Sequence, residues 1–510
     1  MQNSIAQIIT DAAQRYTNKT ALIIGDQQFS YERLDALSNQ VANSLVAIGV
    51  SPGDRVTLYG ANAWEWVVSY YGILKTGAVV NPINVMLTPE EVAFVVEDCG
   101  AKAIIASKEK GLPLIGLETR TSIEKLILYG EDIPVGATSF EHLIEEAPED
   151  FISPLIDPDS LSTICYTSGT TGKPKGAMLS HKAVITNCTM TALMHGRCEQ
   201  DVVVTALPCP HVYGNVVMNG CFQNGGMLVL HSVFELEQVL NSIEKHSATV
   251  FDGVPTMYMY MLESPTIDKR DLSSLRLCAV GGQTMPPAKM KQVEDKFQCP
   301  LVELWGMTEL AGLGTTFAHN GDYRHGSIGV SLPYTQAKII NTKDAAIEMP
   351  TGEAGELLIK GHIVMQGYFG NEEGTREVLS EDGWLRTGDV ACIDASGFIT
   401  IVDRIKDMIL TSGYNIYPAE IENVIASHPD VALVAVGPIP DELKGELAKA
   451  YIILKQGTNP SAENIVSFCR EHLAAYKVPR DIQFVDDLPK TSTGKIMRRE
   501  LIKLHNLQQK

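Results

Sequence analysis

The sequence predicts an α/β protein with a large N-terminal domain of layered α/β subdomains, a β-rich subdomain and a small α+β C-terminal domain. Helix-like and strand-like patterns alternate through the first two-thirds of the 510 residues, which favours largely parallel sheets covered by helices. After about Gly326, short apolar runs are separated by turn-rich stretches, which indicates the β-rich subdomain. The length exceeds what one ordinary core accommodates, so several domains are expected.

The N-terminal elements follow from the spacing of apolar residues. Residues 31–48 and 63–76 carry them at helical spacing, and each run ends at a glycine. Short apolar runs predict strands at residues 55–59, 78–81, 103–106, 161–165, 201–206, 227–230, 249–251 and 277–280.

The later elements are shorter and more turn-rich. The β-rich subdomain is predicted to contain strands at residues 337–341, 355–360, 389–393 and 398–402. A βαβ-like pattern follows, with helices at 420–427 and 462–472 and strands at 431–436, 448–454 and 481–485. We place the domain boundary near residues 403–406, which predicts domains of residues 1–403 and 404–510.

Composition narrows the classes of function. The 61 acidic and 41 basic residues give a formal net charge of −20, so nucleic acid is not an expected partner. The ten cysteines include no C-x-x-C pair, which argues against zinc and redox motifs. Neither a signal-peptide pattern nor a run of about 18 uncharged apolar residues appears, so we expect a cytoplasmic protein without an integral membrane segment. A homodimer is left open.

The strongest local signal is the run from residue 166 to residue 176, Tyr-Thr-Ser-Gly-Thr-Thr-Gly-Lys-Pro-Lys-Gly. Glycines let the backbone approach a ligand closely, and consecutive N–H groups and hydroxyls can surround phosphate oxygens. The spacing does not fit a Walker A loop, and a Gly/Thr surface hairpin without function is the alternative. The expected phosphate contacts are Thr167, Ser168, Gly169, Thr170, Thr171, Gly172 and Lys175.

This run resembles the signature of the adenylate-forming (AMP-binding) superfamily, which contains acyl-CoA synthetases, peptide-synthetase adenylation domains and beetle luciferases. The resemblance covers nearly the whole chain, and further motifs recur in the family's order. It implies ATP, Mg²⁺ and coenzyme A as ligands, and a small C-terminal domain that rotates on a hinge between two half-reactions.

Residues 304–309, Leu-Trp-Gly-Met-Thr-Glu, look like the family's aromatic-Gly-x-Thr-Glu motif. The resemblance implies that Thr308 contacts the α-phosphate and that Glu309 helps to hold Mg²⁺, for which a carboxylate is a suitable ligand. Most relatives have Tyr where this chain has Trp305, whose indole can still stack on adenine. Gly281 and Gly282 resemble the segment that forms a wall of the adenine and acyl pockets, although glycines after a strand are also ordinary turn residues.

Residues 384–389, Trp-Leu-Arg-Thr-Gly-Asp, match the family's aspartate motif and make Asp389 the expected ribose ligand, because a carboxylate can accept both ribose hydroxyls. Arg404 resembles the family arginine near ribose and phosphate. Lys406 falls where the family has its domain hinge. Without these neighbours the charges at residues 403–407 would indicate only a solvated surface cluster.

Two motifs of the C-terminal region complete the resemblance. Residues 412–420 look like the loop that lines the pantetheine channel, where Gly413 leaves room for a narrow thiol arm. Residues 488–495, Leu-Pro-Lys-Thr-Ser-Thr-Gly-Lys, match the catalytic-lysine motif. A long, positively charged side chain such as Lys495 can reach the carboxylate and the α-phosphate as charge builds up.

The acyl pocket is expected along residues 211–220, 281–283 and 305–316. These segments are mostly apolar or small and contain no arginine or lysine to pair with a second carboxylate, so a dicarboxylic acid is disfavoured. The resemblance suggests that His211 orients the carboxylate or aids thiol attack, with a structural histidine as the alternative. Many relatives have Phe where this chain has Pro210.

Together these features predict an acid–CoA ligase that converts an apolar monocarboxylic acid to acyl-AMP and then to acyl-CoA. A fatty acid is the first candidate, and an aryl or hydroxycinnamate-like acid is the second. A stand-alone enzyme that loads a carrier protein is an alternative, although no aspartate lies at residues 210–214 to pair with an amino acid. A nucleotide-binding regulator and an oxygen-dependent luciferase are further alternatives of the same fold.

Overall fold

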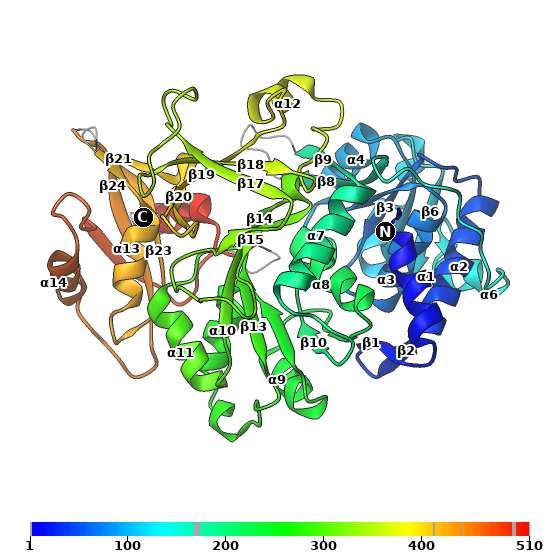
Figure 1. The fold of residues 1–510 in the computed structure, drawn as a ribbon, viewed down its shortest axis with the longest axis horizontal. Coiled ribbons are helices and arrows are strands. Elements are labelled where there is room, and N and C mark those ends of the chain that lie inside the picture. Colours follow the sequence, from blue (N-terminus) through cyan, green and yellow to red (C-terminus); the bar gives the residue numbers. More distant parts are fainter. Residues whose placement is uncertain (1–2, 168–173, 412–413, 442, 492–495, 509–510) are drawn as a thin grey trace.

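The computed structural model describes residues 3–167, 174–411, 414–441, 443–491 and 496–508. Two large mixed sheets with covering helices form most of the N-terminal part, a four-stranded sheet follows, and a five-stranded sheet forms the C-terminal unit. Figure 1 shows these parts side by side along the long axis, from the first sheet in blue and cyan to the C-terminal unit in orange and red. The predicted α/β class with a small C-terminal domain is confirmed.

The seven-stranded sheet carries the predicted phosphate loop at its edge. Its neighbouring strands are parallel except for the last pair, β8 and β9, which form an antiparallel hairpin. In spatial order the strands are β7 (Thr138–Ser139), β6 (Lys125–Tyr129), β5 (Ala101–Ser107), β3 (Arg55–Tyr59), β4 (Val79–Pro82), β8 (Leu161–Thr167) and β9 (Lys175–Ser180).

The nine-stranded sheet has a parallel centre and antiparallel edges. In spatial order its strands are β16 (Val330–Ser331), β15 (Gly312–Thr316), β14 (Leu301–Met307), β13 (Leu277–Gly281), β12 (Val250–Gly253), β10 (Val202–Thr205), β11 (Met227–Leu230), β1 (Thr20–Ile24) and β2 (Gln27–Ser30). The central strands are buried runs of Val, Leu, Ala and Phe, as expected when helices cover both faces.

Helices cover these two sheets. Most of them share one large apolar core with both sheets, and α4 packs in a separate core on the seven-stranded sheet. They are α1 (Ala6–Tyr16), α2 (Tyr31–Ala47), α3 (Trp64–Lys75), α4 (Pro89–Asp98), α5 (Lys108–Gly111), α6 (Phe140–Glu145), α7 (His181–Met194), α8 (Val212–Gln223), α9 (Leu236–Lys245), α10 (Pro255–Leu262) and α11 (Pro287–Phe297). The β1–β2 hairpin was not predicted, because β2 is short and polar and lies at the edge of its sheet.

The β-rich subdomain is the four-stranded antiparallel sheet, as predicted. Its strands are β17 (Thr335–Ile340), β18 (Gly355–Gly361), β19 (Leu385–Ile393) and β20 (Ile399–Arg404), and α12 (Glu372–Val378) lies between β18 and β19. The predicted boundary between residues 403 and 404 falls within the last two residues of β20. The next strand, β21 (Ile409–Thr411), already belongs to the C-terminal sheet, so the change of sheet lies between Arg404 and Ile409.

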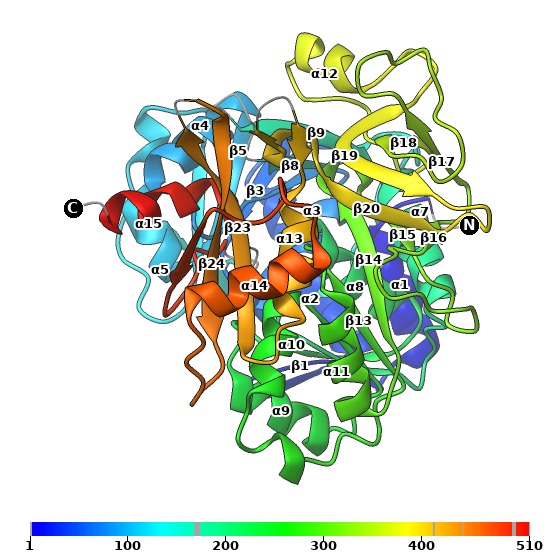
Figure 2. The ribbon, with the colours of Figure 1, turned by 90° about the vertical axis from the view of Figure 1, so that its left-hand side faces the viewer.

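The C-terminal unit has its own apolar core. Its elements are β21, β22 (Tyr414–Ile416), α13 (Pro418–Ala426), β23 (Val431–Asp441), β24 (Gly445–Leu454), α14 (Ala462–His472), β25 (Asp481–Phe484) and α15 (Leu501–Gln508). Figure 2, which turns this unit toward the viewer, shows α13 and α14 beside the long β23–β24 pair.

The predicted βαβ pattern holds for β24, α14 and β25, because β24 and β25 are parallel. In contrast, β23 and β24 form a long antiparallel hairpin, and β23 extends five residues beyond its predicted end at residue 436. The extension contains Pro438 and Pro440, which indicate against a strand in sequence. They are accommodated because β23 lies at the end of the sheet order, where a missing N–H costs no ladder bond on the outer side.

Candidate active site

The base of the predicted phosphate loop is a strand hairpin. Thr167 and Lys175 lie opposite each other at the ends of β8 and β9, and the Thr167 hydroxyl donates to the Lys175 carbonyl over 3.4 Å. The Lys175 ammonium lies 3.6 Å from a Glu377 carboxylate oxygen and 5.1 Å from the centre of the Tyr368 ring. The predicted contacts that lie outside the described residues are Ser168, Gly169, Thr170, Thr171 and Gly172.

The predicted metal ligand Glu309 is buried in a short 3₁₀ turn, Thr308–Leu310, directly after β14. Its carboxylate accepts a 2.7 Å hydrogen bond from the hydroxyl of Tyr368. Burial, followed by the charge of Glu309, raises the pKa of Tyr368, so this hydroxyl stays a donor. Thr308 is half-buried beside it. Sequence reasoning missed Tyr368, which follows β18 and lies 59 residues from its partner.

A second cluster joins Trp305, Asp389 and Arg404. The Trp305 indole N–H donates to one carboxylate oxygen of Asp389 over 2.7 Å, and the Arg404 guanidinium lies 3.2 Å from the other. Asp389 and Arg404 are paired residues of the neighbouring strands β19 and β20. Burial raises the pKa of Asp389, whereas Arg404 and Trp305 oppose that rise. Trp305, at the position where most relatives have Tyr, thus supplies an N–H donor to the predicted ribose ligand.

We expect Trp305→Phe to raise the KM for ATP by about 5–20-fold with a smaller effect on kcat, because it removes a hydrogen bond to a charged group and leaves the aromatic face. Steady-state kinetics with varied ATP tests this. Trp384→Phe is the matched control, because Trp384 lies in the sequence motif of Asp389 but its ring contacts Lys338, whose ammonium is 4.2 Å from the ring centre. An unchanged KM in Trp305→Phe would show that the indole N–H does not support nucleotide binding.

The predicted pocket wall at Gly281 and Gly282 ends β13. A Cβ atom on Gly281 would lie 2.1 Å from a methyl carbon of Leu304, and Gly282 has φ +91°, which favours glycine. The next residue, Gln283, contacts the C-terminal unit: its amide oxygen accepts from the Ile496 N–H over 3.0 Å, and its amide nitrogen donates to the Ile496 carbonyl over 3.4 Å. The residue after Lys495 is therefore held against the predicted pocket wall.

The predicted hinge Lys406 is exposed in the 3₁₀ turn Ile405–Asp407, between the sheet of the β-rich subdomain and the C-terminal sheet. Arg498 links this region to the chain end, with its guanidinium 3.0 Å from Asp403, 3.3 Å from Asp407 and 2.6 Å from Glu422. The segment around the catalytic-lysine motif is thus tied to the hinge. Lys495 and Gly413 themselves lie outside the described residues.

Glu303 is a buried carboxyl beneath the predicted pocket wall at residues 281–283. One of its oxygens accepts from the Met285 N–H over 3.2 Å, and within the described part of the chain the other has no hydrogen-bond partner. Burial raises the pKa of Glu303 to about 8. Between about pH 4.5 and pH 8 this carboxyl is therefore protonated in the folded state and ionised in the unfolded state. The free energy of unfolding falls as pH rises through that window.

Glu303→Gln keeps the acceptor for Met285 and removes the ionisable group. We expect its Tm to rise relative to the wild type as the pH goes from about 5 to about 8, equivalent to about 1–3 kcal/mol of unfolding free energy. Parallel thermal melts across that range test this. A Tm difference that stays constant with pH would contradict it.

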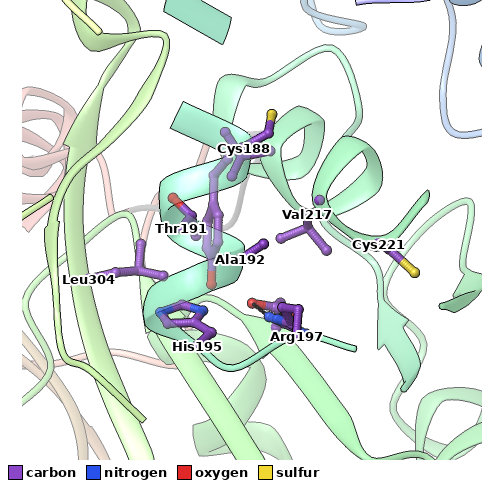
Figure 3. A pocket seen from close by; sticks show the side chains of 12 residues that line it. Cys188, Thr191, Ala192, His195, Arg197, Val217, Cys221 and Leu304 are labelled. Atoms are coloured by element: carbon purple, nitrogen blue, oxygen red, sulfur yellow. Dashed lines mark hydrogen bonds and ion pairs between the residues drawn. The ribbon is translucent and has the colours of Figure 1, made fainter. Parts of the chain in front are cut away.

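His211 caps α8, where its ring Nδ1 accepts from the Tyr213 N–H over 3.2 Å. It is half-buried, and its proposed role at the substrate carboxylate stays a prediction. Beyond it, α7, α8, β12 and β14 enclose a narrow cavity lined on the apolar side by Val216, Val217 and Leu304 (Figure 3). Its lining also includes His195 and Arg197, which sequence reasoning did not select because they lie outside the segments expected to form the pocket.

The predicted Mg²⁺ ligand, Glu309, has Thr308 as its neighbour in the chain. Across the described ranges no cluster of three or more His, Cys, Asp or Glu side chains could hold a metal ion. The Thr308 hydroxyl and the Glu309 carboxylate nevertheless supply the hard oxygen donors that suit Mg²⁺, which is commonly bound by one or two carboxylates together with phosphate oxygens.

Among the helices that the structure describes, none is long and apolar enough to cross a membrane.

Two models of one known enzyme family match most of the chain. The model of the AMP-binding enzyme matches residues 9–369, and that of the AMP-binding enzyme C-terminal domain matches residues 420–495. The chain belongs to the AMP-binding enzyme family. The predicted membership of the adenylate-forming superfamily is therefore confirmed.

Curated relatives and solved structures agree with this assignment. The enzyme is 33% identical to a long-chain-fatty-acid–CoA ligase of Bacillus subtilis (strain 168), with 98% of this chain and 94% of that relative covered. It is 34% identical to a feruloyl-CoA synthase of Amycolatopsis sp, with 94% and 95% covered. The crystal structure of the anthranilate CoA ligase AuaEII with anthranoyl-AMP superposes with a TM-score of 0.92 at 30% identity and covers all of both chains.

This AMP-binding enzyme is an AMP-forming acyl-CoA synthetase, as predicted. ATP, coenzyme A and a small carboxylic acid fit the family as its substrates. The relatives are named for different acids, so the family assignment leaves the identity of the acid to the pocket.

Proposed function

We propose that the enzyme is an ATP-dependent acid–CoA ligase for an acid that is apolar over most of its length, with a fatty acid as first candidate. An aryl acid is second, because relatives named for ferulate and anthranilate share the fold. The observation that carries the proposal is that Tyr368 joins Glu309 to the hairpin base, since its hydroxyl donates to Glu309 and its ring lies against Lys175. The bond from Trp305 to Asp389 and the C-terminal tail held against Gln283 add support.

In the first half-reaction a carboxylate oxygen of the acid attacks the α-phosphorus of ATP. The bond to the bridging oxygen breaks, pyrophosphate leaves and acyl-AMP forms. The loop between β8 and β9 would hold the β- and γ-phosphates, and Asp389 with Arg404 would hold the ribose. Lys495 would place its positive charge near the carboxylate and the α-phosphate, where charge builds up. Glu309 and Thr308 would hold Mg²⁺, which supplies charge neutralisation at the phosphates.

In the second half-reaction the sulfur of coenzyme A attacks the acyl carbon, and AMP leaves with the electrons of the broken C–O bond. We propose that the C-terminal unit turns about Lys406, so that Lys495 serves the first step and the face around Gly413 serves the second. The contact between Gln283 and Ile496 supports the first of these arrangements, because it holds the residue next to Lys495 at the pocket wall.

Acid-dependent exchange of labelled pyrophosphate into ATP tests the adenylation step. We expect exchange with medium-chain or long-chain fatty acids in a panel that also contains benzoates, cinnamates and amino acids. No exchange with any acid would refute the proposed activity. Exchange with an acid that is then transferred to a carrier protein but not to coenzyme A would support the carrier-loading alternative.

A further inference from the structure

The chain on either side of the catalytic-lysine motif is paired with itself. Its two arms are residues 489–490 and 496–497, and an antiparallel bridge joins Lys490 to Ile496. We call these two arms the tail base. Lys495 directly precedes the second arm in the chain, so the position of the tail base limits where Lys495 can act.

The tail base is part of the C-terminal unit. Leu488 and Leu501 are buried in a small apolar core with Ala435 of β23 and Tyr451 of β24, and Ile496 packs against this core. The tail base is therefore expected to turn together with the C-terminal unit as one body.

The second arm of the tail base contacts the N-terminal domain through Gln283. The Gln283 amide oxygen accepts from the Ile496 N–H over 3.0 Å, and the amide nitrogen donates to the Ile496 carbonyl over 3.4 Å. One half-buried side chain thus bonds both backbone groups of a single residue. Two bonds in opposite directions specify the position of that residue better than one bond does.

The first arm contacts α10, also in the N-terminal domain. The Lys490 ammonium donates to the Tyr260 hydroxyl over 2.8 Å and lies 5.4 Å from the centre of the Tyr260 ring. Asp487 forms an ion pair with the same ammonium, and Phe234 stacks on the Tyr260 ring. Each arm of the tail base therefore has its own partner in the N-terminal domain.

A third contact between the domains is buried. The Lys289 ammonium of α11 donates to the carbonyl of Val431, the first residue of β23, over 3.0 Å, and Lys289 is only 3% exposed. Figures 1 and 2 both show α11 beside α13 of the C-terminal unit. The unit is thus docked against α10, α11 and the end of β13.

We propose that Gln283 and Tyr260 are positioning residues for the first half-reaction, which set the tail base so that Lys495 reaches the carboxylate and the α-phosphate. The inference rests on the proposed acid–CoA ligase function and adds the N-terminal residues that select one orientation of the C-terminal unit. A contact shifts an equilibrium between two orientations only if it differs between them. These contacts join the two domains, so they favour the orientation in which both domains meet here.

Two single variants test this. Gln283→Leu removes both hydrogen bonds to Ile496, and we expect it to lower kcat for acid-dependent pyrophosphate exchange by about 5–20-fold. Tyr260→Phe removes one hydroxyl and should lower the same kcat by about 3–10-fold. In both variants the KM for ATP should stay within about twofold of the wild type, and thioester formation from supplied acyl-AMP within about threefold, because neither depends on the tail base.

Matched controls remove similar groups whose partners lie within the N-terminal domain. They are Gln223→Leu, since the Gln223 amide donates to the Thr189 hydroxyl over 2.9 Å, and Tyr323→Phe, since the Tyr323 hydroxyl donates to the His319 carbonyl over 2.6 Å. Both controls should retain both half-reactions.

Combining Gln283→Leu with Lys495→Ala separates positioning from a structural role. If Gln283 acts through Lys495, its replacement should lower exchange by less than about twofold in the Lys495→Ala background. A further loss as large as that in the single variant would overturn the inference. Equal loss of both half-reactions in Gln283→Leu, or a raised KM with an unchanged kcat, would overturn it as well.

The wild-type enzyme distinguishes failure of this inference from failure of the proposed function. Exchange at the wild-type rate in both single variants would overturn the inference and leave the ligase function intact. No exchange with any acid in the wild type would refute the ligase function and the inference with it. Thermal melts check folding, and Tyr260→Phe decides the question if Gln283→Leu does not fold, because the Tyr260 ring is 46% exposed.

Discussion

Replacing Lys495 by alanine is expected to slow adenylate formation by about 10²–10³-fold, because the variant lacks the positive charge proposed to meet the developing charge on the α-phosphate. The rate of thioester formation from supplied acyl-AMP and coenzyme A should stay within about threefold of the wild type, because no pyrophosphate leaves in that step. Pyrophosphate exchange measures the first half-reaction, and the release of AMP from purified acyl-AMP measures the second.

Lys503→Ala is the matched control for this experiment. It removes the same charge from the same tail, but from a lysine whose ammonium contacts Glu500 on the surface. The control should retain both half-reactions. Equal loss of both half-reactions in Lys495→Ala would contradict the division of labour between the two faces of the C-terminal unit.

Replacing Glu309 by glutamine is expected to lower kcat/KM for adenylation by about 10²-fold and to raise the Mg²⁺ concentration needed for half-maximal rate. The change keeps the shape of the side chain and an acceptor for the Tyr368 hydroxyl, but it removes the negative charge proposed to hold the ion. Titration of Mg²⁺ at saturating ATP and acid measures both effects, and removal of Mg²⁺ with a chelator should stop the wild-type reaction.

Tyr368→Phe separates the charge of Glu309 from its position. This variant keeps the carboxylate and removes only the 2.7 Å hydrogen bond that orients it. We expect a loss of about 5–20-fold, smaller than that of Glu309→Gln, because the ion keeps its ligand. A Glu309→Gln enzyme with normal Mg²⁺ dependence would refute the role of Glu309 at the metal, whatever its loss of rate.

Short-range patterns predicted most of the fold correctly. The strands at residues 55–59 and 227–230 and the helix at residues 462–472 have the predicted bounds, because their apolar periodicity is uninterrupted. The β23 extension was missed because two prolines obscure it, and the β1–β2 hairpin was missed because β2 is polar. In both cases an edge position in the sheet decided the structure, and no local pattern reports that position.

The sequence selected Glu309 and Asp389 through their motifs, one shortly after β14 and one within β19, and the roles of both stay predictions. The supporting residues of the site were not selected, because they come from distant parts of the chain. Tyr368 lies 59 residues from Glu309, and Gln283 lies 213 residues from Ile496. Arg197 has no motif of its own, and it lines the cavity where it pairs with Asp252, 55 residues away on β12.

The fate of the oxygen atoms of the acid tests the central claim most directly. The enzyme is given ATP, Mg²⁺, coenzyme A and an acid with isotopically labelled carboxylate oxygens, and the nucleotide products are analysed by mass spectrometry. Attack of the carboxylate on the α-phosphorus predicts one labelled oxygen in AMP for each acyl-CoA formed, with unlabelled pyrophosphate. Formation of ADP with the label in inorganic phosphate would contradict the account, because it would place the attack on the γ-phosphorus.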